Sequence, residues 1–223
     1  MDHSKNILHN VRQAVLVTVV LMLLCGLGFP LLLNGLAAVI FPHQAAGSIV
    51  TVNGVPVGAE HVGQEFTEPY FMKGRPSAVH YNTFTEDAEG NRFYNDGSEF
   101  GGLGSGSNNY GNSNPALAER VAADMDAFLA ANPDVAREDI PTDLMTASGS
   151  GLDPHISPAS AAVQLPAIEA ASGLSREVLE QIVADNTEGK LLGIFGEETV
   201  NVLGVNIAIA EQMGLLPAAD AEA

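Results

Sequence analysis

The stretch Ala14–Phe41, AVLVTVVLMLLCGLGFPLLLNGLAAVIF, decides the architecture of this chain. It holds 28 residues and no charged side chain. As a helix it would reach about 42 Å, against a bilayer hydrocarbon core of about 30 Å. Its first part, Val15 to Leu24, is apolar all round and lacks the polar face of a surface helix. We therefore predict a short segment 1–13, a transmembrane helix 14–41 and a soluble domain 42–223.

A cleaved signal peptide is the competing interpretation of the same stretch. Lys5 and Arg12 would form its positive region, and Ala45-Ala46-Gly47 would supply small residues for cleavage. The apolar part of a signal peptide is about 7 to 15 residues long, roughly half of what is present here. The length therefore favours an uncleaved anchor.

Two residues inside the span predict local features of the helix. Pro30 should kink it, because proline lacks the N–H that the helical ladder needs. Asn34 is a lone amide that is better placed against another helix than against lipid. We expect that helix to belong to another subunit.

The cations that flank the span predict its orientation. Lys5 and Arg12 precede the span, and the next cation is Lys73. Positively charged flanks stay in the cytoplasm, so the N-terminus should be cytoplasmic and the domain 42–223 extracytoplasmic.

The charge and cysteine content limit what the domain can do. Two of the 9 cations and one of the 27 acids precede the span, which leaves 7 cations against 26 acids, a formal charge of −19. Such a surface repels nucleic acid and attracts cations, and most of its acids should form solvated faces. The single cysteine, Cys25, lies in the span, so no intrachain disulfide is possible.

Local signals after the span predict an α+β domain. Asn53-Gly54 between two β-branched runs indicates a hairpin over 48–57, whereas the Gly-, Asn- and acid-rich composition of 86–111 indicates a long exposed loop. Helix starts are indicated by Asn114-Pro115, Ser157-Pro158 and Ser175. The segment 200–210 is compatible with a helix capped by Asn201 or with a strand.

The densest run of chemically active residues extends from Thr146 to Pro158. Ser148 or Ser150 as a nucleophile, with Asp153 and His155 nearby, would suit a hydrolase. No clear strand-to-helix nucleophile elbow surrounds these serines, however. Asp153 and His155 could also be two metal ligands, but a catalytic zinc site needs a third. The interpretation we favour is a structural loop in which Asp153 caps a turn fixed by Pro154.

Two further motifs have simple explanations. The run 101–107 is glycine-rich, but it lacks the lysine of a phosphate-binding P-loop and indicates a flexible loop. Arg75-Pro76-Ser77 could bind an anion, although an ion pair with one of the many acids is the default expectation.

Taken together, the motifs resemble a known family over almost the whole chain. The matching elements, in chain order, are Phe41-Pro42-His43-Gln44-Ala45, Gly47-Ser48, Gly63-Gln64, Phe66, Tyr70-Phe71, Arg75-Pro76-Ser77-Ala78, Tyr81-Asn82, Ser107-Asn108, Gly111, Asn114-Pro115, the run from Pro141 to Gln164, and Val200-Asn201-Val202-Leu203 with Asn206. This pattern resembles the C subunit of the Kdp-type potassium-transporting P-type ATPase of bacteria, the KdpC family.

The resemblance marks a set of candidate site residues and one departure. The motif residues are Arg75, Pro76, Ser77, Thr146, Ser148, Gly149, Ser150, Gly151, Asp153, Pro154, His155, Ser157, Gln164, Asn201 and Asn206. The departure is the acidic segment at about 83–106, which stands where the family has a short connection, and Tyr110 replaces a usual leucine.

The resemblance implies an accessory subunit without catalytic residues or a cofactor of its own. Its partners would be a channel-like A subunit, an ATP-hydrolysing B subunit and a small F subunit. In this family a role as a catalytic chaperone that raises the ATP affinity of the pump subunit has been proposed, with ATP bound mainly by that subunit. This role conflicts with an extracytoplasmic domain, since ATP is cytoplasmic. A membrane-anchored exported serine hydrolase is the alternative.

Overall fold

The computed structural model describes residues 3–216. Its internal contacts divide the chain into two units, Met1–Ile49 and Val50–Ala223.

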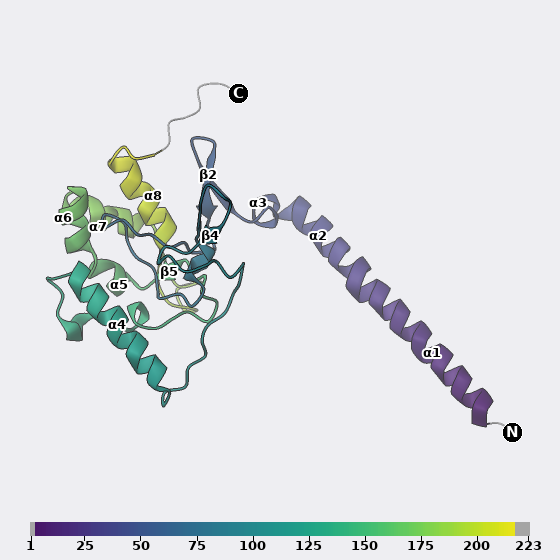
Figure 1. Cartoon of the computed structure of the whole chain (residues 1–223). Coiled ribbons are helices and arrows are strands. Elements are labelled where there is room, and N and C mark those ends of the chain that lie inside the picture. The colour runs from purple at the N-terminus through teal and green to yellow at the C-terminus, as the bar shows by residue number, and fades with distance from the viewer. Residues whose placement is uncertain (1–2, 217–223) are drawn as a thin grey trace. The chain divides into compact units, whose positions relative to one another are not determined.

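The first unit is dominated by one long apolar helix (Figure 1). It consists of α1 (His3–Leu23), the π-helical turn η1 (Leu24–Gly28) and α2 (Phe29–Ile40). The part Ile7–Ile40 is long and apolar enough to cross a membrane, and its most apolar window buries none of its surface within the chain. Phe41 leaves the helical region at φ −133° and ψ 61°, and the single turn α3 (Pro42–Ala45) follows.

Just before Pro30, where a kink is expected, the structure has the π-helical turn η1. Pro30 lies in the first turn of α2, and the N–H of Phe29 bonds to the carbonyl of Leu24, five residues earlier. Widening the helix by one residue separates the proline ring from the preceding turn, whose carbonyl it would otherwise meet. The helix therefore continues through the proline.

The second unit begins around a hairpin of β1 (Ile49–Val52) and β2 (Val55–Ala59). Asn53 and Gly54 have φ of 52° and 83°, as a type I′ turn requires at both central positions. The hairpin prediction is confirmed.

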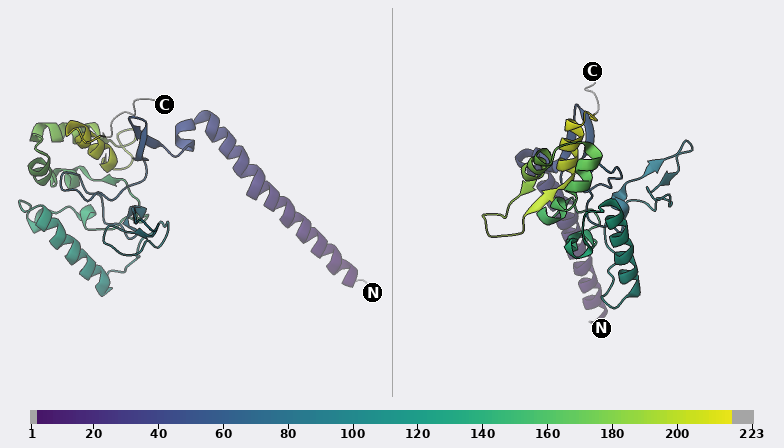
Figure 2. Two further views of the ribbon diagram at one scale, coloured as in Figure 1. Left: turned by 45° about the horizontal axis from the view of Figure 1, so that its top comes forward. Right: turned by 90° about the vertical axis from the view of Figure 1, so that its left-hand side faces the viewer.

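The acidic segment 83–106 contains a small hairpin of its own. Strands β3 (Thr85–Glu86) and β4 (Arg92–Phe93) pair antiparallel, and this arm projects from the body of the domain (Figure 2, right). Arg92 bonds to Glu86 at 3.0 Å and lies 4.6 Å from the ring centre of Phe84. The ring of Phe84 in turn contacts that of Phe100. This cluster of rings orders a stretch whose composition alone indicated a loop.

The remaining helices begin where their capping residues predict. Helix α4 (Pro115–Ala131) is capped by Asn114, α5 (Pro158–Ala162) by Ser157 and α7 (Arg176–Asp185) by Ser175. Between the last two lies α6 (Leu165–Ser172), which Gly173 ends at φ 73°. Short 3₁₀ turns η3 (Arg137–Asp139) and η4 (Thr142–Leu144) lead from α4 to the motif run.

Both interpretations of 200–210 are correct for part of the segment. Strand β7 (Thr199–Asn201) ends at Asn201, whose side chain accepts the N–H of Gly204 and caps α8 (Val202–Gln212). In the sheet, β7 lies between β5 (His155–Ile156) and β6 (Thr187–Glu188), and both pairings are antiparallel.

The core lies between this sheet and the C-terminal helices α5, α6, α7 and α8 (Figure 1). Its buried side chains are Met72, Ile156, Ala161, Leu165, Ile168, Leu179, Ile182, Val200, Val202, Val205 and Ile209. The architecture is α+β with one candidate membrane span, as the sequence predicts.

Candidate functional site

The motif residues gather around one irregular segment, Met72 to Tyr81. Asn206, which is only 2% exposed, accepts the Met72 N–H at 2.8 Å and donates to the Met72 carbonyl at 2.9 Å. Gln164 does the same for Lys73, accepting its N–H at 2.8 Å and donating to its carbonyl at 3.2 Å. The two buried amides therefore replace a missing neighbouring strand, and they position the chain that carries Arg75.

Arg75 joins this segment to the motif run. Its Nη1 lies 3.0 Å from Asp153 Oδ2, and its Nε and Nη2 each lie 3.3 Å from the Thr146 carbonyl. Both partners in the ion pair are about three-quarters shielded from solvent. Asp153 also accepts the His155 N–H at 3.0 Å, which confirms its expected role of capping a turn. The ion pair expected of Arg75 is present.

Ser77 makes the second connection to the motif run. Its hydroxyl donates to the Gly151 carbonyl at 2.6 Å and accepts the N–H groups of Val79 and Tyr81. Gly151 has a φ of +67°, and a Cβ there would come within 2.7 Å of the Gly106 carbonyl and the Val79 side chain. Only glycine fits this position without displacing its neighbours.

A left-handed turn then reverses the chain. His80, Tyr81 and Asn82 have φ of 48°, 53° and 55°, a conformation that costs about 1 to 2 kcal/mol per ordinary residue. The Tyr81 hydroxyl donates to the Arg75 carbonyl at 2.7 Å, and the Asn82 amide forms two 2.9 Å bonds with Gly104. Burial, aided by Asp153, raises the pKa of Tyr81, so this hydroxyl remains a donor at physiological pH.

The two candidate nucleophiles are engaged with the backbone. Ser148, which is buried, accepts the Gly151 N–H at 2.8 Å, and the exposed Ser150 accepts the Leu152 N–H at 3.1 Å. His155 Nδ1 lies 3.8 Å from Asp153, but its Nε2 is buried and has no hydrogen-bond partner among the described residues. The contact between a serine and a histidine that defines a hydrolase site is therefore not formed here.

The remaining motif residues support the fold around this junction. The Pro154 carbonyl accepts the Val202 N–H at 3.0 Å, Asn201 donates to the Glu60 carbonyl at 2.9 Å, and Gly149 is exposed. Over residues 3–216 no three His, Cys, Asp or Glu side chains gather as a metal cluster would need.

Ser157 reveals a carboxylate that the motif analysis missed. Asp143 accepts the Ser157 N–H at 2.8 Å and the Ser160 hydroxyl at 2.6 Å. Burial opposes its ionisation, but the hydrogen bonds from Ser160 and Ser157 outweigh burial and hold the pKa of Asp143 below its usual value. Asp143 lies in the run Pro141-Thr142-Asp143-Leu144, so the signal was present in the sequence.

A groove of about 370 Å³ lies beside Arg75, Pro76 and Ser77. Asp124 and Phe128 of α4 also line it, as do Leu144 and Met145. Arg120 of α4 donates to the Met145 carbonyl at 3.0 Å, which ties the helix to the motif run. Within the helix, Arg120 also pairs with Asp124 one turn later.

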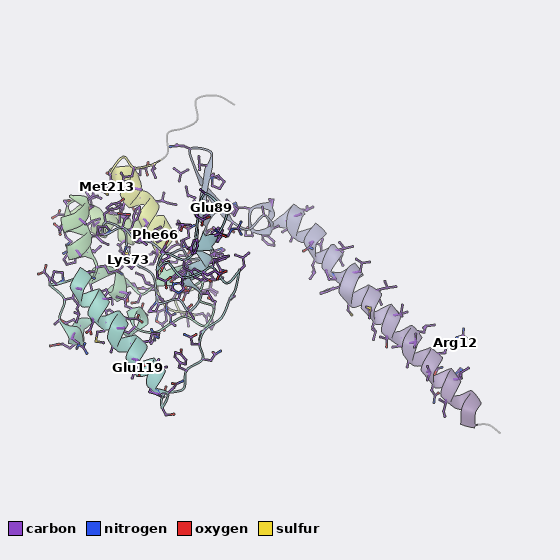
Figure 3. The ribbon with its side chains drawn as sticks, viewed as in Figure 1. Arg12, Phe66, Lys73, Glu89, Glu119 and Met213 are labelled. Atoms are coloured by element: carbon purple, nitrogen blue, oxygen red, sulfur yellow. The ribbon has the colours of Figure 1, made fainter. Side chains whose placement is uncertain are left out.

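Lys73 also lines this groove and lies beside Phe66 (Figure 3). Its ammonium donates to the carbonyls of Phe66 and Glu68 at 2.7 and 2.6 Å. Burial lowers the pKa of Lys73 to about 8, against the opposing influence of Glu68 and Glu65. Lys73 is not one of the motif residues, although it lies two positions before Arg75.

Fold and site together define a class of protein with one candidate membrane span and an α+β domain. In that domain, motif residues join the segment 72–81 to the run 146–158. The chain matches the family model "KdpC: K+-transporting ATPase, c chain" over residues 11–211. It is therefore a member of the KdpC family, as the motif resemblance indicated.

Curated relatives agree with this assignment. The chain is 56% identical to the potassium-transporting ATPase KdpC subunit of Clostridium kluyveri, over 92% of this chain and 95% of the relative. It is 53% identical to the subunit of the same name in Clostridioides difficile, over 92% of this chain and 98% of that relative. It is 41% identical to the potassium-transporting ATPase KdpC subunit of Caldanaerobacter subterraneus, over 91% of this chain and 95% of that relative. Family membership supports a membrane-anchored accessory role in potassium import.

Proposed function

We propose that this chain is a non-catalytic accessory subunit of an ATP-driven, high-affinity potassium importer, needed for assembly and stability of the complex. The family match over residues 11–211 carries the proposal. The geometry of the motif run supports it, because the hydroxyls of Ser148 and Ser150 bond to the backbone, and His155 Nε2 has no hydrogen-bond partner among residues 3–216. The partners in this proposal are the channel-like A subunit, the ATP-hydrolysing B subunit and the small F subunit.

The proposal includes an orientation. Lys5 and Arg12 precede the span and the next cation is Lys73, so the N-terminus lies in the cytoplasm and the domain outside. The domain then acts beside the external entrance for potassium. An effect on the ATP affinity of the pump subunit would have to pass through the span or the partner subunits, since direct contact with cytoplasmic ATP requires the opposite orientation.

Deletion and rescue test this function. Cells that lack only this subunit should lose potassium uptake at limiting potassium, and the full chain should restore it. The expected cause is loss of assembled complex, visible when the remaining subunits no longer co-purify. Uptake that persists at the normal rate without the chain would contradict an accessory role.

The hydrolase alternative is tested on the purified full-length chain with ester and peptide substrates. We expect no turnover above that of a Ser148→Ala, Ser150→Ala double variant. Turnover that disappears in the double variant would instead establish the hydrolase.

A further inference from the structure

The loop 189–198 between β6 and β7 exposes four large apolar side chains, which we call the apolar tip. Leu191, Leu192, Ile194 and Phe195 are 70%, 81%, 75% and 61% exposed. The loop projects from the body of the domain, yellow-green in the right-hand view of Figure 2. Scattered exposed leucines need no explanation, but four large apolar side chains within five residues form a contiguous patch of the kind that marks an interaction site.

Hydrogen bonds hold the apolar tip in one shape. Leu191 and Phe195 exchange backbone bonds of 2.8 and 3.0 Å, and Ile194 donates to the Leu191 carbonyl at 3.2 Å. The backbone of the tip is therefore a closed turn.

Leu192 occupies a backbone position that does not suit leucine. Its φ is +55°, in the left-handed region where glycine or asparagine is favoured. Because 81% of the residue is exposed, burial of its side chain within the chain does not compensate for this conformation. A residue that is unfavourable for folding and unburied within its own chain points to a contact with another molecule.

The charges around the apolar tip indicate the kind of surface it meets. Glu188, Glu197 and Glu198 flank it, and its one cation, Lys190, lies 3.5 Å from Glu197. Anionic membranes attract apolar segments that carry basic flanks, which is the opposite pattern. A protein pocket with an apolar floor and a basic rim complements both the shape and the charge.

We propose that the apolar tip docks into an apolar, basic-rimmed pocket on another subunit of the same transport complex. This inference rests on the proposed function and adds a contact surface to it.

The test uses the full complex with Leu192→Asn, which removes the apolar side chain while suiting the left-handed backbone. The matched control is Leu103→Asn, since Leu103 is 82% exposed on a different loop. We expect Leu192→Asn to raise the apparent dissociation constant of the chain from the other subunits about tenfold or more. Its thermal stability as an isolated chain should stay level or rise, and Leu103→Asn should assemble like the wild type.

A second experiment separates a protein pocket from a membrane. The chain contains no tryptophan, so Phe195→Trp places a single probe in the apolar tip. The isolated full-length variant is reconstituted into phosphatidylcholine and phosphatidylglycerol vesicles with brominated acyl chains. We expect its fluorescence to be unquenched. Strong quenching would assign the tip to the bilayer and overturn the proposal.

The remaining outcomes are also decisive. If the wild-type chain binds its partners and Leu192→Asn binds them equally well, the docking proposal alone is overturned. A wild-type chain that does not co-purify with the other subunits would overturn the proposed function, and the docking proposal with it. An isolated-chain dimer that Leu192→Asn dissolves would assign the tip to a second copy and overturn the partner named here.

Discussion

Asn206 and Gln164 show how single residues build this site. Each side-chain amide both accepts from and donates to the backbone of one residue, Met72 or Lys73. Asn206 lies 134 positions from Met72 and Gln164 lies 91 from Lys73, so no local sequence pattern could predict these bonds. Arg75, two residues further on, then reaches Asp153 at 3.0 Å. Asn206, Gln164 and Asp153 therefore act on one irregular segment and fix its shape.

This network predicts different costs for its two serines. Ser148→Ala leaves the buried Gly151 N–H without its partner and should cost about 1 to 3 kcal/mol of unfolding free energy. Ser150→Ala should cost within about 0.5 kcal/mol, because its hydroxyl is exposed and water replaces it. Thermal unfolding of the full-length chain in detergent checks this order. In complexes that do assemble, transport turnover should be normal, and a thousandfold loss with Ser150→Ala would reinstate a nucleophile.

Lys73 gives the domain a predictable pH dependence. Burial lowers its pKa in the folded chain from 10.5 to about 8, so the folded state binds fewer protons than the unfolded state between these values. Stability should therefore rise between pH 8 and 10.5 and be independent of this group below pH 8. In Lys73→Met the rise in stability that this ammonium causes between pH 8 and 10.5 should be absent. Unfolding curves of the wild type and the variant at several pH values would measure the difference. A slope of the opposite sign would mean that the carbonyls of Phe66 and Glu68 stabilise the ammonium more than burial opposes it.

At the scale of secondary-structure elements, the helix starts and the first hairpin were predictable because their causes are local. Asn114, Ser157, Ser175 and Asn201 each accept an N–H in the first turn of their own helix. Asn53 and Gly54 adopt the positive φ that their residue types favour. Such contacts depend on neighbours in the sequence and not on the rest of the fold.

Elements stabilised by distant or irregular contacts were not predictable. The β3–β4 arm depends on a cluster of rings, in which Phe84 contacts Phe100 and Tyr94 lies against both Phe100 and His80. The spacing of these rings fits neither a helix nor a strand. The left-handed turn at His80 to Asn82 contains no glycine, the residue type that best predicts a positive φ. Its side chains bond to the carbonyls of Arg75 and Gly104, which lie outside the turn.

The helix α2 carries a prediction about assembly. Asn34 lies on its exposed surface, and an amide that finds an interhelical partner is more favourable than one facing lipid by about 1 to 2 kcal/mol. Asn34→Leu should therefore weaken co-purification with the other membrane subunits. Leu36→Met, on roughly the opposite face of the same helix, is the control and should assemble normally. Equal assembly of Asn34→Leu and wild type in native membranes would count against this contact.

At the scale of the whole molecule, the excess of acids predicts a salt-dependent effect on potassium capture. Asp87 and Asp96 accept hydrogen bonds from Asn91 and Ser98, which lower the pKa of each carboxyl below its usual value. Neutralising Glu86, Asp87, Glu89, Asp96 and Glu99 as amides should raise the apparent KM for potassium at low ionic strength, with maximal velocity unchanged.

The effect should fade when an inert salt is added, because screening limits the field to about 8 Å at physiological ionic strength. A shift in KM that is equally large in high salt would indicate direct coordination of potassium. No shift at low salt would leave the arm as a solvated surface.

The side of the membrane that the domain occupies tests the account most directly. In a Cys25→Ala background, Asn112→Cys places one thiol on an exposed loop of the domain, and Ser4→Cys places one in the N-terminal segment. We predict that a membrane-impermeant maleimide labels Asn112→Cys in intact cells or spheroplasts, and Ser4→Cys only after permeabilisation. The reverse pattern would place the domain beside cytoplasmic ATP and contradict an accessory subunit that works outside the cell.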